Sequence, residues 1–206
     1  MSEVTLDVGG AVALEARVSI PGGARAGAVL CHPHPLYGGD MESHVVILAA
    51  QACAARNVAT LRFNFRGVGA STGKHDDGRG EQDDVRAALA ELRRRLPAGA
   101  PLALAGYSFG AAVAAAVAAS TPIGGLALIA PPLRIMPLIP PAVSGPFLIV
   151  VGAEDQYCPP ASLETIRDAH SRLTLTVIDG ADHFFFGAQD ALGAAVEGWA
   201  AALAAP

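Results

Sequence analysis

Short apolar runs alternate with longer segments of mixed character along most of this chain. The apolar runs predict buried strands near residues 28–31, 58–64, 101–106, 125–130, 146–151 and 173–178. The segments between them predict helices near residues 43–56, 81–96, 109–119, 160–171 and 189–204. Strands that alternate with helices are typical of parallel βαβ units. We therefore expect an α/β protein with a mostly parallel sheet and helices on both faces.

The beginning of the chain follows a different pattern. Residues 4–8 and 12–20 alternate between apolar and polar positions on either side of Gly9 and Gly10. This alternation predicts an N-terminal antiparallel hairpin. Neither an internal repeat nor a linker interrupts the sequence, so its length predicts a single domain over residues 1–206.

One predicted strand is joined to the helix after it by Gly106-Tyr107-Ser108-Phe109-Gly110. A Gly-x-Ser-x-Gly segment between a strand and a helix predicts a nucleophile elbow, a tight turn that exposes the serine hydroxyl above the sheet. Gly106 and Gly110 would be needed because side chains at the flanking positions do not fit in such a turn. The helix N-terminus behind Ser108 would favour negative charge near its hydroxyl.

A serine nucleophile needs a base, usually histidine, which a carboxylate orients. Only His170 and His183 follow Ser108 in the sequence. His170 ends a predicted helix, where a histidine commonly contacts the last carbonyl groups. His183 lies in a Gly-containing loop after a predicted strand, and loops carry catalytic groups. We therefore predict that His183 is the base.

The carboxylate is expected at the end of another buried strand. The apolar run from Phe147 to Val151 leads into Gly152-Ala153-Glu154-Asp155. Neighbouring side chains on an extended chain point in opposite directions, so only one of Glu154 and Asp155 can face the histidine. This pattern alone leaves both residues open.

A tetrahedral intermediate also needs N–H donors for its oxyanion. The residue after the nucleophile supplies one donor in this type of site, which predicts the backbone N–H of Phe109. The second donor is expected in the loop of residues 32–39. Because proline lacks an N–H, this loop offers His32, His34, Leu36 or residues beyond them. We predict the backbone N–H of His34.

Two sequence patterns resemble metal or nucleotide sites but are incomplete. Cys31, His32 and His34 are not followed by a second Cys/His pair that would complete a metal site. The segment from Gly67 to Lys74 resembles a phosphate-binding loop, but its spacing of glycines is wrong and His75 stands where Ser or Thr is required. We therefore expect no metal, nucleotide or other cofactor.

The sequence resembles the α/β-hydrolase superfamily, and more narrowly its small lidless bacterial branch near the dienelactone-hydrolase-like proteins. The matching pieces occur in family order, namely residues 32–35, 38–39, 62–71, 80–81, 106–110, 152–155 and 182–183. The resemblance implies the α/β-hydrolase fold, a Ser108–Asp155–His183 triad and ester hydrolysis. It also favours Asp155 over Glu154. True dienelactone hydrolases have cysteine at the elbow, so we do not expect dienelactone chemistry here.

A proline-rich segment, residues 131–141, stands where many α/β hydrolases insert a lid. Prolines cannot build a helical cap, so we expect no cap domain and an open, shallow site. Leu133 and Met136 are predicted to form part of an apolar wall that contacts the substrate, together with Tyr37 from the loop of residues 32–39. The alternative is that the apolar residues of 131–141 form a connecting loop packed on the core.

The composition limits the partners of the protein. Hydrophobic residues make up 52% of the chain and charged residues 16%, which favours an apolar surface patch such as an ester pocket or a homodimer contact. The net charge of −5 argues against nucleic acid or an anionic membrane as a partner. The three cysteines suggest no disulfide framework, and residues 1–10 do not resemble a signal peptide. We therefore expect a cytoplasmic protein.

These observations predict a serine carboxylesterase that cleaves small carboxylic esters through an acyl-enzyme intermediate. Within the same chemistry, the alternatives are an acyltransferase or a peptidase that uses the same triad. Outside it, the alternative is a binding protein without catalytic activity on this fold, because a fold does not by itself determine function.

Overall fold

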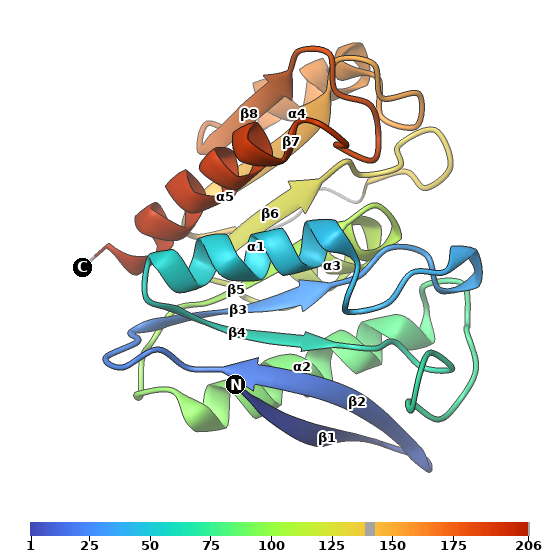
Figure 1. The fold of residues 1–206 in the computed structure, drawn as a ribbon, viewed down its shortest axis with the longest axis vertical. Helices are drawn as coiled ribbons and strands as arrows, with labels where there is room; N and C mark the ends of the chain where they lie inside the picture. The colour runs from blue at the N-terminus through green and yellow to red at the C-terminus, as the bar shows by residue number, and fades with distance from the viewer. Residues whose placement is uncertain (139–142, 206) are drawn as a thin grey trace.

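The computed structural model describes residues 1–138 and 143–205. Its centre is an eight-stranded sheet with the order β1-β2-β4-β3-β5-β6-β7-β8 (Figure 1). Strands β1 (Ser2–Gly9) and β2 (Val12–Ser19) form the predicted antiparallel hairpin, and β2 also pairs antiparallel with β4 (Val58–Phe63).

The remaining strand pairs of this sheet are parallel, as predicted. They involve β3 (Ala26–Cys31), β5 (Leu102–Tyr107), β6 (Gly125–Ile129), β7 (Phe147–Gly152) and β8 (Leu173–Ile178). Every residue of β3 to β7 is buried. Parallel strands covered on both faces show this continuous apolar character, which is why the sequence pattern identified them.

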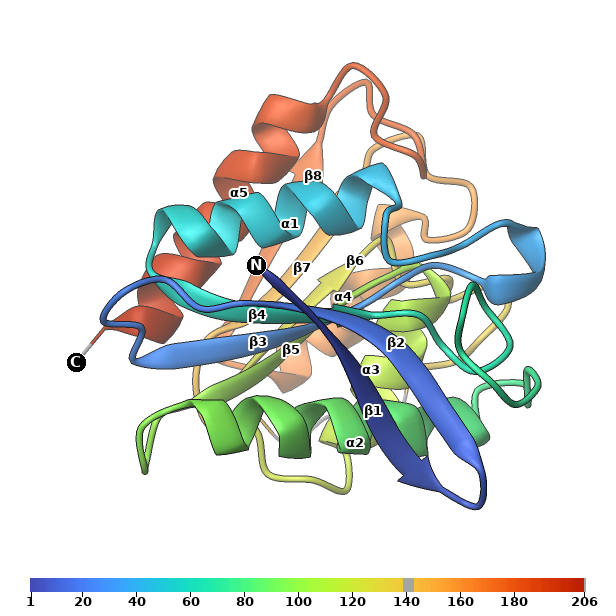
Figure 2. The same ribbon diagram turned by 60° about the horizontal axis from the view of Figure 1, so that its bottom comes forward.

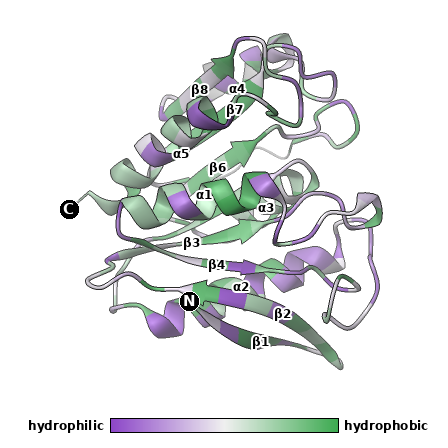
Figure 3. Cartoon of the chain, in the orientation of Figure 1, coloured by the Kyte–Doolittle hydropathy of each residue, from purple (hydrophilic) through white to green (hydrophobic). Residues whose placement is uncertain are grey.

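Helices cover both faces of the sheet, which confirms the predicted α/β layers. Helices α1 (His44–Ala55) and α5 (Gln189–Ala204) lie on one face, and α2 (Gly80–Arg95) and α3 (Phe109–Ala118) lie on the other (Figure 2). Hydrophobic residues follow the central strands, whereas many residues of α2 are hydrophilic (Figure 3). Each face of the sheet therefore has its own apolar core.

Two short segments differ from the predictions. A single helix was expected over residues 160–171, but the chain forms a 3₁₀ turn at Pro160–Leu163 and then the short helix α4 (Glu164–Ala169). Pro159 and Pro160 fix the backbone at the start of this segment. A second 3₁₀ turn, Pro35–Tyr37, lies in the loop after β3, where no helix was predicted.

The connection between β6 and β7 contains no inserted cap in the part that the structure describes. Residues 130–138 and 143–146 form turns, bends and an isolated bridge rather than a helix. Ile139, Pro140 and Pro141 lie outside the described residues. In the described ranges, no helix has the length and apolar character needed to cross a bilayer.

The sheet topology places the predicted site residues at one edge. Ser108 follows β5, Asp155 follows β7, His183 follows β8 and His34 follows β3. Parallel strands end on the same side, and the loops after them gather at the right of Figure 1. Ligands of open α/β sheets bind at this carboxyl edge.

Candidate active site

Ser108 forms a strained turn between β5 and α3. Its backbone angles are φ 54° and ψ −119°, a region that residues other than glycine rarely adopt. Its N–H donates to the carbonyl of Ile129 at 2.9 Å, and its carbonyl accepts from the N–H groups of Ala111 and Ala112. The neighbouring strand and the helix thus hold the turn in the conformation that a nucleophile elbow requires.

The two glycines of the elbow are needed for close backbone approach. A Cβ atom on Gly106 would lie 2.3 Å from the carbonyl oxygen of Gly110. A Cβ atom on Gly110 would lie 2.3 Å from the carbonyl oxygen of Cys31, at the end of β3. Both contacts are with backbone atoms, which cannot move aside without disturbing α3 or the sheet.

We expect Gly110→Ala to lower the free energy of unfolding by roughly 1–3 kcal/mol, because the added methyl group overpacks the turn. Urea denaturation measures this change. Gly198→Ala on α5 is the matched control, since no atom lies within 4 Å of its Cβ position. There alanine should raise helix stability by up to about 1 kcal/mol. Equal stability of the two variants would contradict this explanation of the elbow.

His183 lies between the two other predicted triad residues. Its Nε2 is 3.0 Å from Ser108 Oγ, and its Nδ1 is 2.9 Å from Asp155 Oδ2. With a proton on Nδ1, the ring donates to the carboxylate and accepts from the serine hydroxyl, which is the arrangement of a general base. His170 lies elsewhere, with its ring 5.4 Å from that of Phe147.

Asp155 is buried, and its carboxylate is fully engaged. Its Oδ1 accepts from the N–H groups of Tyr157 and Cys158 at 2.8 and 2.9 Å, while Oδ2 faces His183. Burial alone would raise the pKa of Asp155, but the hydrogen bonds from His183 and the backbone lower it below its usual value. Glu154 is exposed. The structure therefore turns Asp155, not Glu154, toward the histidine.

Two tyrosines that the sequence prediction missed hold the His183 loop. The hydroxyl of Tyr107 donates to the carbonyl oxygen of His183 at 3.1 Å. The ring of Tyr157 packs edge-on against the imidazole, with centroids 4.7 Å apart. Tyr107 lies inside the elbow motif, but the residue that it contacts, His183, is 76 positions away in the sequence. The motif describes only local sequence and therefore did not indicate this contact.

The two residues predicted to donate to the oxyanion, His34 and Phe109, contact each other through their rings. The rings of His34 and Phe109 are 4.9 Å apart, and both residues border the same cavity as Ser108. The N–H of Leu36 donates to the His34 ring at 3.2 Å, so it is not free for a ligand. Within residues 1–138 and 143–205, no hydrogen bond engages the backbone N–H of His34 or Phe109. Their role as oxyanion donors stays a prediction.

His32 has a structural role. Its Nδ1–H donates to the carbonyl of Pro33 at 2.6 Å, and its Nε2 accepts from the N–H of Phe65 at 3.0 Å. Burial lowers the pKa of His32 to about 4, so the ring is neutral and joins two loops. Among the described residues, no group of three His, Cys, Asp or Glu side chains could hold a metal ion.

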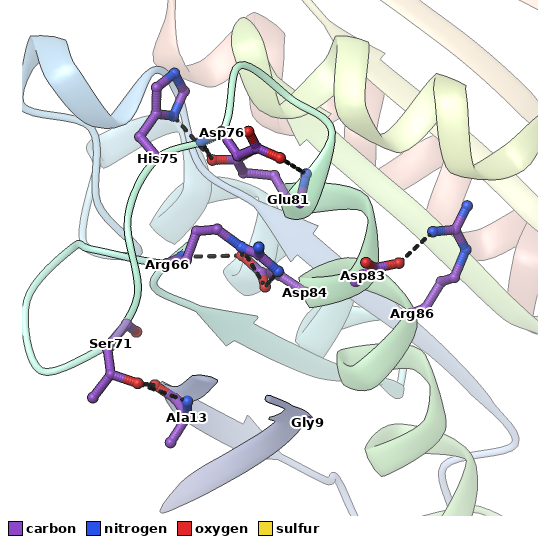
Figure 4. A network of polar contacts seen from close by, with 12 residues as sticks. Gly9, Ala13, Arg66, Ser71, His75, Asp76, Glu81, Asp83, Asp84 and Arg86 are labelled. Atoms are coloured by element: carbon purple, nitrogen blue, oxygen red, sulfur yellow. Dashed lines mark hydrogen bonds and ion pairs between the residues drawn. The ribbon is translucent and has the colours of Figure 1, made fainter. Parts of the chain in front are cut away.

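The ring of His34 contacts another histidine, His75, whose own partner is buried. The ring of His75 lies 4.9 Å from that of His34, and its Nδ1 is 3.0 Å from a carboxylate oxygen of Glu81 (Figure 4). Glu81 is fully buried and accepts from the N–H groups of Asp76 and Gly78 at 2.8 Å each. Gly80-Glu81 belonged to the sequence resemblance, but only the fold shows what this glutamate holds.

A cavity of about 550 Å³ opens beside Ser108, within the range of sites for small organic molecules. Residues of the loops after β3, β5, β6, β7 and β8, and of the start of α1, border it. Tyr37 and Met136 are among them, and their contact with a substrate stays a prediction. Leu133 is not among them, and it packs against the hydrophobic core instead.

The chain is similar in sequence and in fold to known proteins. A family model described as "Alpha/beta hydrolase domain" matches residues 26–202. An alpha-beta serine hydrolase homologue from Coxiella burnetii has a TM-score of 0.85 and 34% identity, with 95% of each chain covered. A serine hydrolase without lid from Xanthomonas campestris has a TM-score of 0.84 and 34% identity, with 96% of this chain and 92% of that chain covered.

One curated relative also matches over most of its length. An uncharacterized protein of Rickettsia prowazekii (strain Madrid E) is 34% identical over 174 residues, which cover 77% of this chain and 71% of the relative. This similarity supports common ancestry but brings no substrate with it.

Proposed function

This chain belongs to the alpha/beta hydrolase domain family, and on that premise we propose that it is a carboxylesterase acting on small, uncharged esters. The observation that carries the proposal is the hydrogen-bonded series from Asp155 through His183 to Ser108. A serine hydroxyl activated in this way attacks acyl carbonyl groups.

The proposed reaction has two halves. Ser108 Oγ attacks the ester carbonyl while His183 Nε2 takes the hydroxyl proton, and the N–H groups of Phe109 and His34 bind the oxyanion. The imidazolium, stabilised by Asp155, then protonates the leaving alcohol as the carbon–oxygen bond breaks. Water attacks the acyl-enzyme with the same base, which releases the acid and restores Ser108.

The cavity supports an uncharged substrate. Among the described residues that border it, none is Asp, Glu, Lys or Arg. None of these bordering residues carries a Lys or Arg group that would pair with the phosphate groups of a phosphorylated acyl donor. This property favours ester hydrolysis over acyl transfer from a phosphorylated carrier.

Hydrolysis of p-nitrophenyl esters from acetate to laurate tests this proposal. We expect the highest kcat/KM for short acyl chains, because an uncapped site buries few of the CH₂ groups of a long chain, each worth about 0.8 kcal/mol. The proposal fails if no member of the series is hydrolysed above the rate in buffer. A clear preference for laurate would contradict the short-chain specificity, because binding such a chain requires a tunnel.

The same series also tests the consequence of the missing cap. Without a lid, no opening step can be triggered by a lipid surface. The rate on short esters should follow ordinary saturation as substrate passes its solubility limit. An abrupt increase at that limit would contradict this expectation.

A further inference from the structure

One side of the cavity is bordered by aromatic side chains that the reaction does not use. Phe184 and Phe186 are 44% and 69% exposed, and both border the cavity. His44, the first residue of α1, borders it as well. Large apolar side chains left exposed together often mark a binding site.

These rings form a nearly parallel set, which we name the aromatic platform (His44, Phe184 and Phe186). The planes of Phe184 and Phe186 differ by 19°, with centroids 6.3 Å apart. The planes of Phe186 and His44 differ by 16°, with centroids 4.8 Å apart. The Nε2–H of His44 donates to the carbonyl of Phe184 at 2.8 Å, which fixes the histidine ring against the loop.

The backbone of the loop holds the platform in place before any ligand binds. Phe185, between the two exposed rings, is fully buried and has a positive φ of 57°, which is a strained conformation for phenylalanine. The Asp182 carboxylate accepts from the N–H groups of Phe184 and Phe185 at 2.9 and 3.1 Å. Strain of this kind persists where the surroundings over-determine it, commonly at ligand sites. A preorganised surface also loses less entropy on binding.

The platform lies beside the group that serves the leaving alcohol. The ring of Phe184 packs edge-on against the imidazole of His183, with centroids 5.5 Å apart. In the proposed reaction, His183 passes its proton to the alcohol oxygen, so the alcohol half of the ester lies next to this ring.

A different part of the cavity suits the acyl half. Pro132, Ile135 and Met136, from the loop after β6, border the cavity and are aliphatic. A Cβ atom on Gly78 would lie within 4 Å of the side chains of both Met136 and Phe109. Met136 therefore lies near the side chain of Phe109, whose N–H is a proposed oxyanion donor.

We propose that the aromatic platform binds a planar aromatic group in the alcohol half of the ester. The substrate class is then esters of aryl or arylmethyl alcohols with short aliphatic acids. This inference rests on the proposed function and adds the substrate specificity of the proposed esterase. A ligand ring that stacks on one further aromatic face gains about 0.5–1.5 kcal/mol beyond burial, which corresponds to about a two- to tenfold preference.

The test compares benzyl butanoate with cyclohexylmethyl butanoate, which differ in the flatness of one ring. Both form the same butanoyl-enzyme, so their ratio of kcat/KM reports the alcohol half alone. We expect the wild type to prefer the benzyl ester about two- to tenfold. Phe186→Leu should abolish the preference, and Phe186→Tyr, which keeps the ring, should retain it. Val177→Ala, at an exposed apolar position of β8 outside the cavity, should not change it.

A reciprocal pair of esters locates the aromatic group. Butyl phenylacetate and butyl cyclohexylacetate place the same two rings in the acyl half, and their ratio should not respond to Phe186→Leu. A ratio that responds here and not in the benzyl pair would overturn the assignment to the alcohol half. Equal kcat/KM values of the wild type for benzyl butanoate and cyclohexylmethyl butanoate would overturn the proposal that the platform binds an aromatic group.

Failure of the proposed function gives a different result. If no ester is cleaved, carboxylesterase activity is wrong, and calorimetric binding of the same esters to Ser108→Ala still decides the inference. Tighter binding of benzyl butanoate than of cyclohexylmethyl butanoate, lost on adding Phe186→Leu, would support the platform. Equal affinities would overturn it.

Discussion

Ser108→Ala is expected to lower kcat for ester hydrolysis by a factor on the order of 10³ or more, with the fold intact. The variant removes the oxygen that His183 approaches at 3.0 Å, so no acyl-enzyme can form. The loss is large because the serine and its base act as a unit. The measurement is the initial rate on p-nitrophenyl butanoate, with circular dichroism as the check on folding.

A second serine provides the control for this result. Ser120 lies just beyond the other end of α3, exposed and outside the cavity. Ser120→Ala should keep wild-type activity and should react with a fluorophosphonate probe, whereas Ser108→Ala should not react. Near-wild-type hydrolysis by Ser108→Ala would contradict the assignment of Ser108 as the nucleophile.

Asp155→Asn is expected to lower kcat by about 10³- to 10⁴-fold, far more than Glu154→Gln. Asparagine removes the charge that stabilises the imidazolium. Its amide group can also donate to Nδ1 of His183, which favours the tautomer whose Nε2 already carries a proton. That nitrogen cannot accept the proton of Ser108. Steady-state rates on one short ester compare the two variants, and the opposite ranking would show that Glu154 is the acid.

The loss of stability caused by Asp155→Asn should also depend on pH. The pKa of Asp155 is lower in the folded protein, so its ionised form stabilises the fold above the unfolded pKa of about 3.9. This contribution is lost as the pH falls through the folded pKa. The difference in unfolding free energy between wild type and variant should therefore narrow on acidification. A difference that does not depend on pH would argue that the carboxylate charge is not responsible.

The local pattern of the sequence predicted most of the strands and helices, and it placed Ser108 in the turn between β5 and α3. Strands β3 to β7 are buried on both faces, so their apolar character did not depend on knowing which strands pair. The elbow around Ser108 is equally local, because its glycines, strand and helix lie within one short segment. His183 followed from chain order, since few histidines come after the serine.

The residue pattern alone left Glu154 and Asp155 open, and the family resemblance favoured Asp155. The contacts of the fold give the physical reason. The carboxyl end of β7 meets the loop after β8, where the N–H of Glu154 donates to the carbonyl of Ala181 at 3.0 Å. This pairing leaves the Glu154 side chain exposed and directs Asp155 inward. Likewise, the ring of His34 occupies the N–H of Leu36, which removes one of the donors that the sequence left open.

The sequence named Tyr37 and Met136 as candidate wall residues, but tertiary structure decided which other residues border the cavity. Leu133 and Met136 have similar apolar character and lie in one proline-rich segment, but only Met136 faces the cavity. His44 and Phe186 belong to segments far apart in the sequence and stack only because α1 packs beside the loop after β8. Periodicity reports which residues are buried along one element. It does not report which distant surfaces meet, because that depends on how the whole sheet brings its loops together.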